Sequence, residues 1–245
     1  MEVLFFISLP VISFLYASVG HGGASGYLAL MVLFSFATED IRTIALTLNL
    51  CVAGISFLHF KKEGHFKINL FYPFIMGSIP AAFIGGMLEI DSYWYKRILG
   101  IFLLIATIRF MVQKKKSDEN IPINIGLAIF IGSIIGLFSG MIGIGGGIIL
   151  SPVILLLGWG NLKETAAVSA LFIFINSAFG LAGNYFSDFQ LAFGISSEKL
   201  ILILFLAVAG GYAGSHWGSR LKSIDILKFV LAGILAIASV KLWLI

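Results

Sequence analysis

The stretch Gly143-Ile144-Gly145-Gly146-Gly147 has a counterpart in Gly20-His21-Gly22-Gly23, which lies 123 residues earlier in the chain (143 minus 20). Both motifs interrupt long apolar runs. Helices in lipid must satisfy their own backbone, so clustered glycines at membrane depth occur only where protein or a water-filled cavity supplies partners. A break that occurs once in each half of the chain is a pointer to the binding site of a membrane transporter.

The composition supports a membrane class. Hydrophobic residues make up 59% of the 245 residues, charged residues make up 11%, and the mean hydropathy is +1.04. A soluble domain is about 45–50% apolar and about 25% charged. The apolar excess therefore needs lipid as its solvent.

Charge and cysteine usage exclude several other classes. The net charge of +4 comes from basic residues in short loops, without interleaved aromatic residues, so no nucleic-acid partner is expected. The single Cys51 excludes an internal disulfide and a cysteine-based zinc site. No histidines or carboxylates have metal-ligand spacing, and no catalytic Ser/His/Asp arrangement is present. We therefore expect no metal, no cofactor and no enzymatic activity.

The apolar runs fall into two matching halves. They lie near 3–19, 24–37, 41–60, 68–88 and 93–112, and again near 123–140, 147–160, 165–186, 199–219 and 226–245. The only markedly hydrophilic stretch separates them. We predict a first transmembrane repeat at 1–112, a cytoplasmic linker at 113–122 and a second repeat at 123–245.

The runs at 24–37 and 147–160 are shorter than the others. Spanning a membrane takes ~20 apolar residues, and these two have about 14. Each directly follows a glycine break, as a half-helix would. We predict an all-α polytopic membrane protein with two inverted repeats, each a glycine-broken hairpin plus three transmembrane helices, giving about 8–10 helical segments.

Basic residues indicate the topology. If each broken hairpin returns to the side where it began, eleven Lys and Arg residues lie on one side and five on the other. If it crosses once, the division is nine to seven. The positive-inside rule favours the first arrangement, with both termini outside the plasma (inner) membrane of a prokaryote. Residues Trp94, Trp159, Trp217 and Trp243 fall near run ends, as in an interfacial aromatic belt.

The helix after each break predicts a binding site. Its first turn points free N–H groups and the positive end of its dipole into the break. Two such ends facing each other would bind an anion without a basic side chain. The structural alternative is that the small residues only allow close helix packing. The candidate substrate-binding residues are Gly20, His21, Gly22, Gly23, Ser25, Thr47, Asn49, Gly143, Gly145, Gly146, Gly147, Ser169 and Asn176.

Among these, His21 is the one ionisable side chain within a break, and its counterpart in the second repeat is Ile144. It would bind an anion or carry a coupling proton, or it would be a neutral histidine bonded to a helix carbonyl. Thr47 and Ser169 keep a hydroxyl in both repeats, for substrate binding or for helix–helix bonding. We expect His59 to be solvated and His216 to pack at the membrane interface.

The chain resembles the sulfite exporter TauE/SafE family of bacterial and archaeal permeases. The similarity lies in Gly143–Gly147 followed by Pro152, in the helix start Thr165–Ser169, and in the glycine-spaced stretch Gly210–Leu221. The resemblance implies a plasma-membrane transporter of small anions, such as sulfite, sulfonates or related organic acids, driven by proton or ion gradients. The chain departs from the family pattern at His21 and at Ala24.

We therefore predict a secondary transporter that moves a small anion by alternating access, which inverted repeats suit. Its expected partners are this anion, the lipid bilayer and, as a further option, copies of itself in a homo-oligomer. The alternative function is a channel or carrier for a neutral or cationic small solute. An intramembrane enzyme would need clustered catalytic groups, and a nucleotide-binding loop would need a strand–helix context, and neither is present.

Overall fold

The computed structural model describes residues 2–112, 121–187, 196–220, 236–237 and 239–243. Within these ranges the chain is helical and contains no strand. Its nine named helices are α1 (Glu2–Ser18), α2 (Ala24–Leu33), α3 (Thr38–Lys62), α4 (Ile68–Met87), α5 (Ser92–Val112), α6 (Ile125–Ile142), α7 (Gly147–Leu156), α8 (Leu162–Phe186) and α9 (Ser197–Gly218). Helical residues also occur at 236–237 and 239–243. The predicted all-α class is confirmed.

Among the described residues, five helices are long and apolar enough to cross a membrane. These are Asp40–Lys62 of α3, α4, α6, α8 and α9. Large apolar side chains on their outer faces, such as Leu58, Phe130 and Phe205, are 62%, 62% and 68% exposed. Such side chains are suited to contact with lipid tails rather than water. The chain is a multi-pass membrane protein.

Both glycine motifs break the helices because several of their glycines have a left-handed backbone. In the first motif, Gly20, Gly22 and Gly23 have φ angles of 76°, 62° and 102°. In the second, Gly143, Gly145 and Gly146 have φ angles of 88°, 72° and 78°. These angles suit glycine because it has no Cβ. The two breaks thus have the same conformation at corresponding positions.

A short helix follows each break. The helices α2 and α7 have 10 residues each, so each is about 15 Å long. That is half the thickness of a membrane core of about 30 Å. The predicted half-helices are therefore present, and they are shorter than the apolar runs that indicated them.

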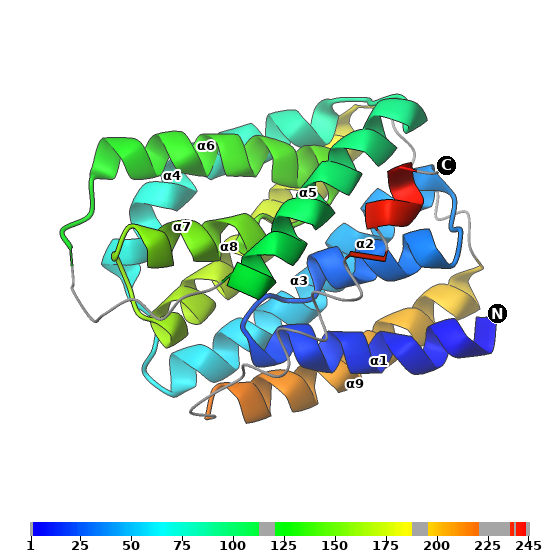
Figure 1. Cartoon of the computed structure of the whole chain (residues 1–245), viewed down its shortest axis with the longest axis horizontal. Coiled ribbons are helices and arrows are strands. Elements are labelled where there is room, and N and C mark those ends of the chain that lie inside the picture. Colours follow the sequence, from blue (N-terminus) through cyan, green and yellow to red (C-terminus); the bar gives the residue numbers. More distant parts are fainter. Residues whose placement is uncertain (1, 113–120, 188–195, 221–235, 238, 244–245) are drawn as a thin grey trace.

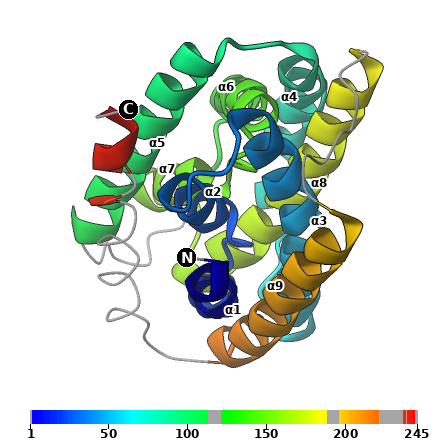
Figure 2. The ribbon, with the colours of Figure 1, turned by 90° about the vertical axis from the view of Figure 1, so that its right-hand side faces the viewer.

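The longest helices of the two halves pack antiparallel. Both α3 and α8 have 25 residues. Asn184 near the end of α8 donates to Thr43 near the start of α3, at 3.3 Å. Figure 1 shows the two helices running in opposite directions across the bundle, and Figure 2 shows them side by side.

Two further helix pairs join one half of the chain to the other. The first-half helix α4 packs along α6 of the second half, while α9 packs along α1 (Figure 2). In both pairs small residues let the backbones touch. A methyl group on Gly140 of α6 would overlap the carbonyl oxygen of Ala82 in α4, and one on Gly218 of α9 would overlap that of Ser18 in α1. Close packing through small residues is typical of membrane helices.

Basic side chains cap the ends of several helices. Arg42 donates to the carbonyl oxygens of Gly85, Gly86 and Leu88 at the end of α4. Lys163 donates to Ser219 O after α9, at 2.9 Å. A cation near the last carbonyls of a helix is favourable because it meets the negative end of the helix dipole.

Several sequence expectations need correction or fall outside the described residues. Trp159 is 8% exposed and packs against Phe74, so it is a core residue and not part of an interfacial belt. Most of the expected linker, residues 113–120, and most of the last apolar run lie outside the described ranges. The division at 113–122 remains a prediction.

Candidate functional site

The two glycine breaks meet on one side chain of α8. A methyl group on Gly22 would come 3.4 Å from Ile173 Cγ2, and one on Gly145 would come 2.7 Å from the same atom. The breaks are separated by more than a hundred residues in the chain, and the tertiary fold brings them to one point. The predicted convergence of the two motifs is a feature of this structure.

The meeting point lies near the middle of the long helices. Ile173 is the twelfth residue of α8 counted from Leu162, and Asn49 is the twelfth of α3 counted from Thr38. Asn49 Nδ2 donates to Gly143 O at 3.4 Å, which links α3 to the second break. His21, Asn49 and Ser169 are 6%, 0% and 0% exposed, so the site is closed to solvent in this conformation.

A polar cluster connects the first break to the second half of the chain. His21 Nε2 lies 2.9 Å from Ser151 Oγ in α7, and His21 Nδ1 lies 2.9 Å from Val19 O. Ser151 Oγ also lies 2.8 Å from Ser169 Oγ in α8 and 2.9 Å from Gly147 O. The carbonyl of Val19 can only accept, so Nδ1 carries a hydrogen. Sequence reasoning missed Ser151, although it lies one helical turn after the break at Gly147.

Two buried amide oxygens near the breaks have no hydrogen-bond partner among the described residues. These atoms are Asn49 Oδ1 and Asn176 Oδ1. Asn176 Nδ2 donates to Phe172 O at 2.8 Å, which leaves its oxygen as a spare acceptor. Ser169, Ile173 and Asn176 lie at helical spacing on one face of α8. An unpaired buried acceptor costs free energy, so it is well placed to receive a donor from a ligand.

The helices that follow the breaks begin at a left-handed glycine, whereas α3, α4, α6, α8 and α9 begin at an extended residue. The N-cap residues of α2 and α7 are Gly23 and Gly146, and neither helix has a side-chain cap. The side chains of Asn124 and Asn161 cap α6 and α8, while α3, α4 and α9 also lack a side-chain cap but have a residue with a side chain at the N-cap. The starts of α2 and α7 thus present backbone and dipole to the interior without a side chain in between, which is a geometry suited to an anion.

Two predicted site residues form hydrogen bonds outside the polar cluster, and their part in substrate binding remains a prediction. Thr47 Oγ1 donates to Thr43 O within α3, at 2.8 Å. Ser25 Oγ donates to Tyr16 Oη at 3.1 Å, which ties α2 to α1. The hydroxyl shared by the repeats therefore has different partners in the two halves, because Ser169 contacts Ser151 while Thr47 bonds its own helix.

Two histidines away from the breaks, His59 and His216, form a separate cluster where α3 and α9 end. The Nδ1 atom of His59 lies 2.8 Å from Ser215 Oγ, and its ring is 5.4 Å from that of His216. His59 is half-buried, so it is only partly solvated. Arg220 contacts His216 Nε2 at 3.0 Å and Glu63 Oε1 at 3.1 Å. This cluster lies on the same end of the bundle as Lys61 and Lys62.

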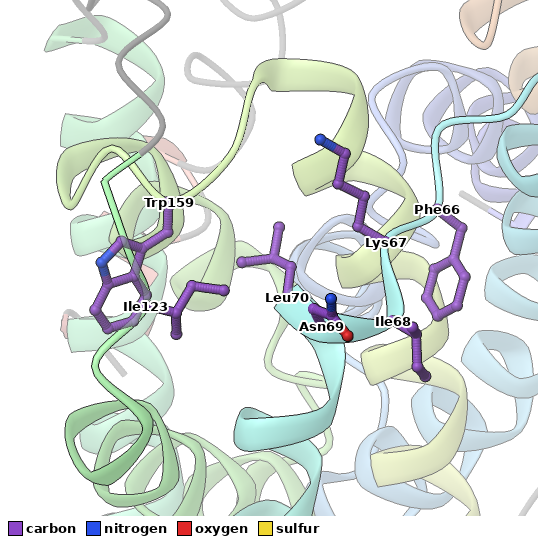
Figure 3. Close-up of a pocket in the computed structure, with 7 residues that line it drawn as sticks. All are labelled: Phe66, Lys67, Ile68, Asn69, Leu70, Ile123 and Trp159. Atoms are coloured by element: carbon purple, nitrogen blue, oxygen red, sulfur yellow. The ribbon is translucent and has the colours of Figure 1, made fainter.

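A cavity of about 320 Å³ lies at that basic end, where α4, α6 and α8 begin. Figure 3 shows Trp159 and Ile123 on one side of it and Lys67, Phe66 and Ile68 on the other. The Nζ atom of Lys67 is 2.6 Å from Glu164 Oε1, so its charge is already compensated. The cavity is therefore a weaker candidate for anion binding than the breaks.

Comparison with known proteins agrees with this architecture. The family model described as sulfite exporter TauE/SafE matches residues 4–242. The probable membrane transporter protein y4hK of Sinorhizobium fredii is 35% identical over 241 residues, which cover 96% of each chain. No solved structure matches the chain significantly.

Proposed function

Because this chain belongs to the sulfite exporter TauE/SafE family, we propose that it carries a small anion, such as sulfite or a sulfonate, across the plasma membrane of a prokaryote. It is a membrane transporter, and the proposal concerns its substrate and mechanism. The observation that carries it is the convergence of Gly22 and Gly145 on Ile173 in the middle of the bundle.

The chemistry of the breaks favours an anion. The helices α2 and α7 both start beside the meeting point without side-chain caps, so the positive ends of two helix dipoles are directed there. His21 adds a donor or a positive charge beside them. Transporters with broken helices use such half-helix N-termini for anionic substrate groups.

The packing supports alternating access. The helices α3 and α8 are antiparallel, and α1 and α6 take their partners α9 and α4 from the opposite half. In an inverted repeat, exchange of the two half-conformations exchanges the side to which the site is open. The closed site of this structure would then be an occluded state between the two open ones.

The orientation that we propose has both termini outside. Basic residues at the end formed by Lys61, Lys62, Lys67 and Lys163 support it through the positive-inside rule. A cysteine at Glu63 in a Cys51→Ala background tests it. A membrane-impermeant maleimide should label this cysteine only after the cytoplasmic face of the membrane is made accessible. Labelling in intact cells would show that the protein has the opposite orientation.

A pair of glycine variants tests the site. Gly22→Ala places a side chain at a φ of 62° and 2.8 Å from Ala53 Cβ, so it should reduce flux by at least about tenfold. Gly64→Ala is the matched control, because Gly64 has a φ of 79° in a loop with nothing within 4 Å. We expect G64A to transport normally. Equal flux in G22A and wild-type proteoliposomes would contradict the proposal.

A binding screen tests the substrate class. Purified protein should melt at a higher temperature with sulfite, thiosulfate or a sulfonate, because a ligand that binds the native state stabilises it by mass action. Carboxylates and chloride provide the comparison within anions. G22A should lose the shift, while G64A keeps it.

A second candidate is a carrier for a neutral solute that donates hydrogen bonds. The unpartnered Oδ1 atoms of Asn49 and Asn176 favour it, because they accept and do not donate. A shift with polyols or amides, and none with anions, would support this second function.

A further inference from the structure

We propose that His21 binds the coupling proton and that Ser151 is its hydrogen-bond partner in both protonation states, so that the protein moves a proton and an anion in the same direction. This inference rests on the proposed function for its coupling to an anion. The proton site itself rests on the geometry around His21.

The hydrogen bonds around His21 suit the neutral ring. Nδ1–H donates to Val19 O, and the Ser151 hydroxyl donates to the lone pair of Nε2. The Ser169 hydroxyl donates to Ser151 Oγ. Each nitrogen of the ring then has a partner, as a buried neutral histidine requires.

The same atoms suit the charged ring after one hydroxyl rotation. A proton taken from water in an open state binds Nε2, and Nε2–H donates to Ser151 Oγ. The Ser151 hydrogen turns to Gly147 O, which lies 2.9 Å away. Ser169 continues to donate to Ser151 Oγ, which has two lone pairs. No heavy atom needs to move, so the network holds His21 in either state, and the proton leaves Nε2 for water when the site opens on the other side.

No other group near neutral pH competes for this role on the elements around His21. The helix α7 has no titratable residue. The titratable or charged side chains of α1, α2 and α8 have their own environments: Tyr16 accepts from Ser25, Tyr27 contacts Ser13, Glu164 pairs with Lys67, and Lys163 donates to Ser219. On α3, Cys51 is half-buried, Asp40 and Arg42 lie at the start of the helix, where Arg42 donates to the end of α4, and His59, Lys61 and Lys62 lie at its other end, where His59 contacts Ser215. Among these described groups, His21 is the histidine beside the break, and histidine titrates in the physiological range.

Charge links the proton to the anion. An uncapped helix start, such as that of α7 beside Ser151, has a positive dipole end that disfavours a second positive charge on His21. An anion bound at the break instead favours the positive charge on His21, because the anion attracts the imidazolium. Each of the two bound charges therefore increases the affinity for the other, which is reciprocal by linkage. The proton and the anion are then carried together.

The second repeat lacks a corresponding proton site. The positions that match His21, Ser151 and Ser169 are Ile144, Leu28 and Thr47, at offsets of 123, 123 and 122. Leucine and isoleucine bind no proton, and Thr47 bonds Thr43 O. The inference is thus one proton per transport cycle.

A first experiment tests the proton site without a substrate. Full-length protein labelled with ¹⁵N-histidine in nanodiscs is studied by NMR between pH 5 and 9, and His21→Gln identifies the ring signals of His21. We expect these signals to change from a neutral, Nδ1-protonated ring to an imidazolium within this range. A ring that keeps one protonation state from pH 5 to 9 overturns the proposal, whatever the protein transports.

A second experiment tests coupling. Proteoliposomes that contain a pH-sensitive dye receive radiolabelled methanesulfonate, a strong-acid anion that carries no proton of its own. Wild-type protein should acidify the lumen as methanesulfonate enters. His21→Gln should move methanesulfonate without a pH change or lose flux, and Ser151→Ala should lower flux by about 10- to 100-fold, the factor for a hydrogen bond to a charged group. Ser151→Thr keeps the hydroxyl and should stay within about threefold of wild type.

The outcomes separate this inference from the proposed function. Methanesulfonate entry without acidification in wild type overturns the coupling. If His21 titrates by NMR but no anion from the screen binds or moves, the proposed function fails and the proton site stands. Equal flux and equal acidification in wild type and Ser151→Ala would remove Ser151 from the mechanism.

Discussion

Asn184 donates a hydrogen bond of 3.3 Å to Thr43, and both residues are buried. The contact joins the end of α8 to the start of α3, and Phe60 near the end of α3 packs with Ala166 and Ala167 near the start of α8, so these two helices run in opposite directions. The same antiparallel relation is what an inverted repeat needs between its equivalent helices. One bond between two uncharged side chains therefore joins the two central helices at this end of the pair.

We expect Asn184→Ala to lower the free energy of unfolding by about 1–3 kcal/mol, because it leaves the buried Thr43 hydroxyl without this partner. Thermal unfolding in detergent measures the change. The Thr43→Val/Asn184→Ala double variant should cost less than the sum of the Thr43→Val and Asn184→Ala changes. Strict additivity in the double-mutant cycle would mean that the bond is not energetically coupled.

The close packing of α6 on α4 predicts a strong effect of one methyl group. Gly140→Ala would overlap the carbonyl oxygen of Ala82, which is backbone and cannot turn away. Overpacking of this kind costs about 1–3 kcal/mol, so we expect a lower melting temperature. Gly126→Ala is the control in the same helix, since its added methyl would meet only Asn124 Oδ1 at 3.7 Å. An equal change in both variants would contradict the packing argument.

The hydrogen bonds of Lys241 should slow hydrogen exchange at the end of α2. Its Nζ atom donates to Val32 O and Leu33 O, each at 2.8 Å, and to Ser35 Oγ at 3.0 Å. Lys241→Met removes these donors and keeps most of the apolar stem. Hydrogen exchange at the backbone amides of 34–36 should become about tenfold faster, equivalent to about 1.4 kcal/mol. Lys241→Arg should restore slow exchange, and unchanged rates in the Met variant would exclude a capping role.

The ion pair of Glu63 with Arg220 should make the stability of the protein depend on pH. The hydrogen bond from Arg220 holds the pKa of Glu63 below its ordinary value. A depressed carboxyl pKa adds stability that is present above the unfolded-state pKa and is lost as the pH falls through the folded-state value. Wild type should therefore melt above Glu63→Gln at neutral pH, by a small amount because the pair is exposed. The difference should vanish on acidification toward pH 3, and a constant difference would contradict the ion pair.

Much of the fold follows from the pattern of apolar runs. The starts of α2, α4 and α7 agree with the predicted runs, because a glycine break or a polar loop marks each of them. The short helices also follow from sequence, since an apolar run of about half the usual length cannot span a membrane. The left-handed glycines were foreseeable for the same reason, because only glycine adopts that conformation easily.

The side-chain contacts at the candidate site could not be predicted from the sequence in this way. Nothing in the sequence distinguishes Ser151 from the other residues of its apolar run. Its contact with His21 depends on how α7 packs beside the first break. His59 reads as a loop-side residue, yet α9 covers it with Ser215 and His216. Thr47 reads as the equivalent of Ser169, but its hydroxyl bonds its own helix.

The sequence alone determined where the helices break, because the glycines that permit a left-handed turn and the polar residues that end apolar runs act within a few neighbouring residues. Only the tertiary structure decided which side chains meet at the breaks. Some of those contacts, such as His21 with Ser151, join residues more than a hundred positions apart, and they depend on the crossing and register of α3, α7 and α8. Helix–helix packing fixes that register, and no local pattern in the chain encodes it.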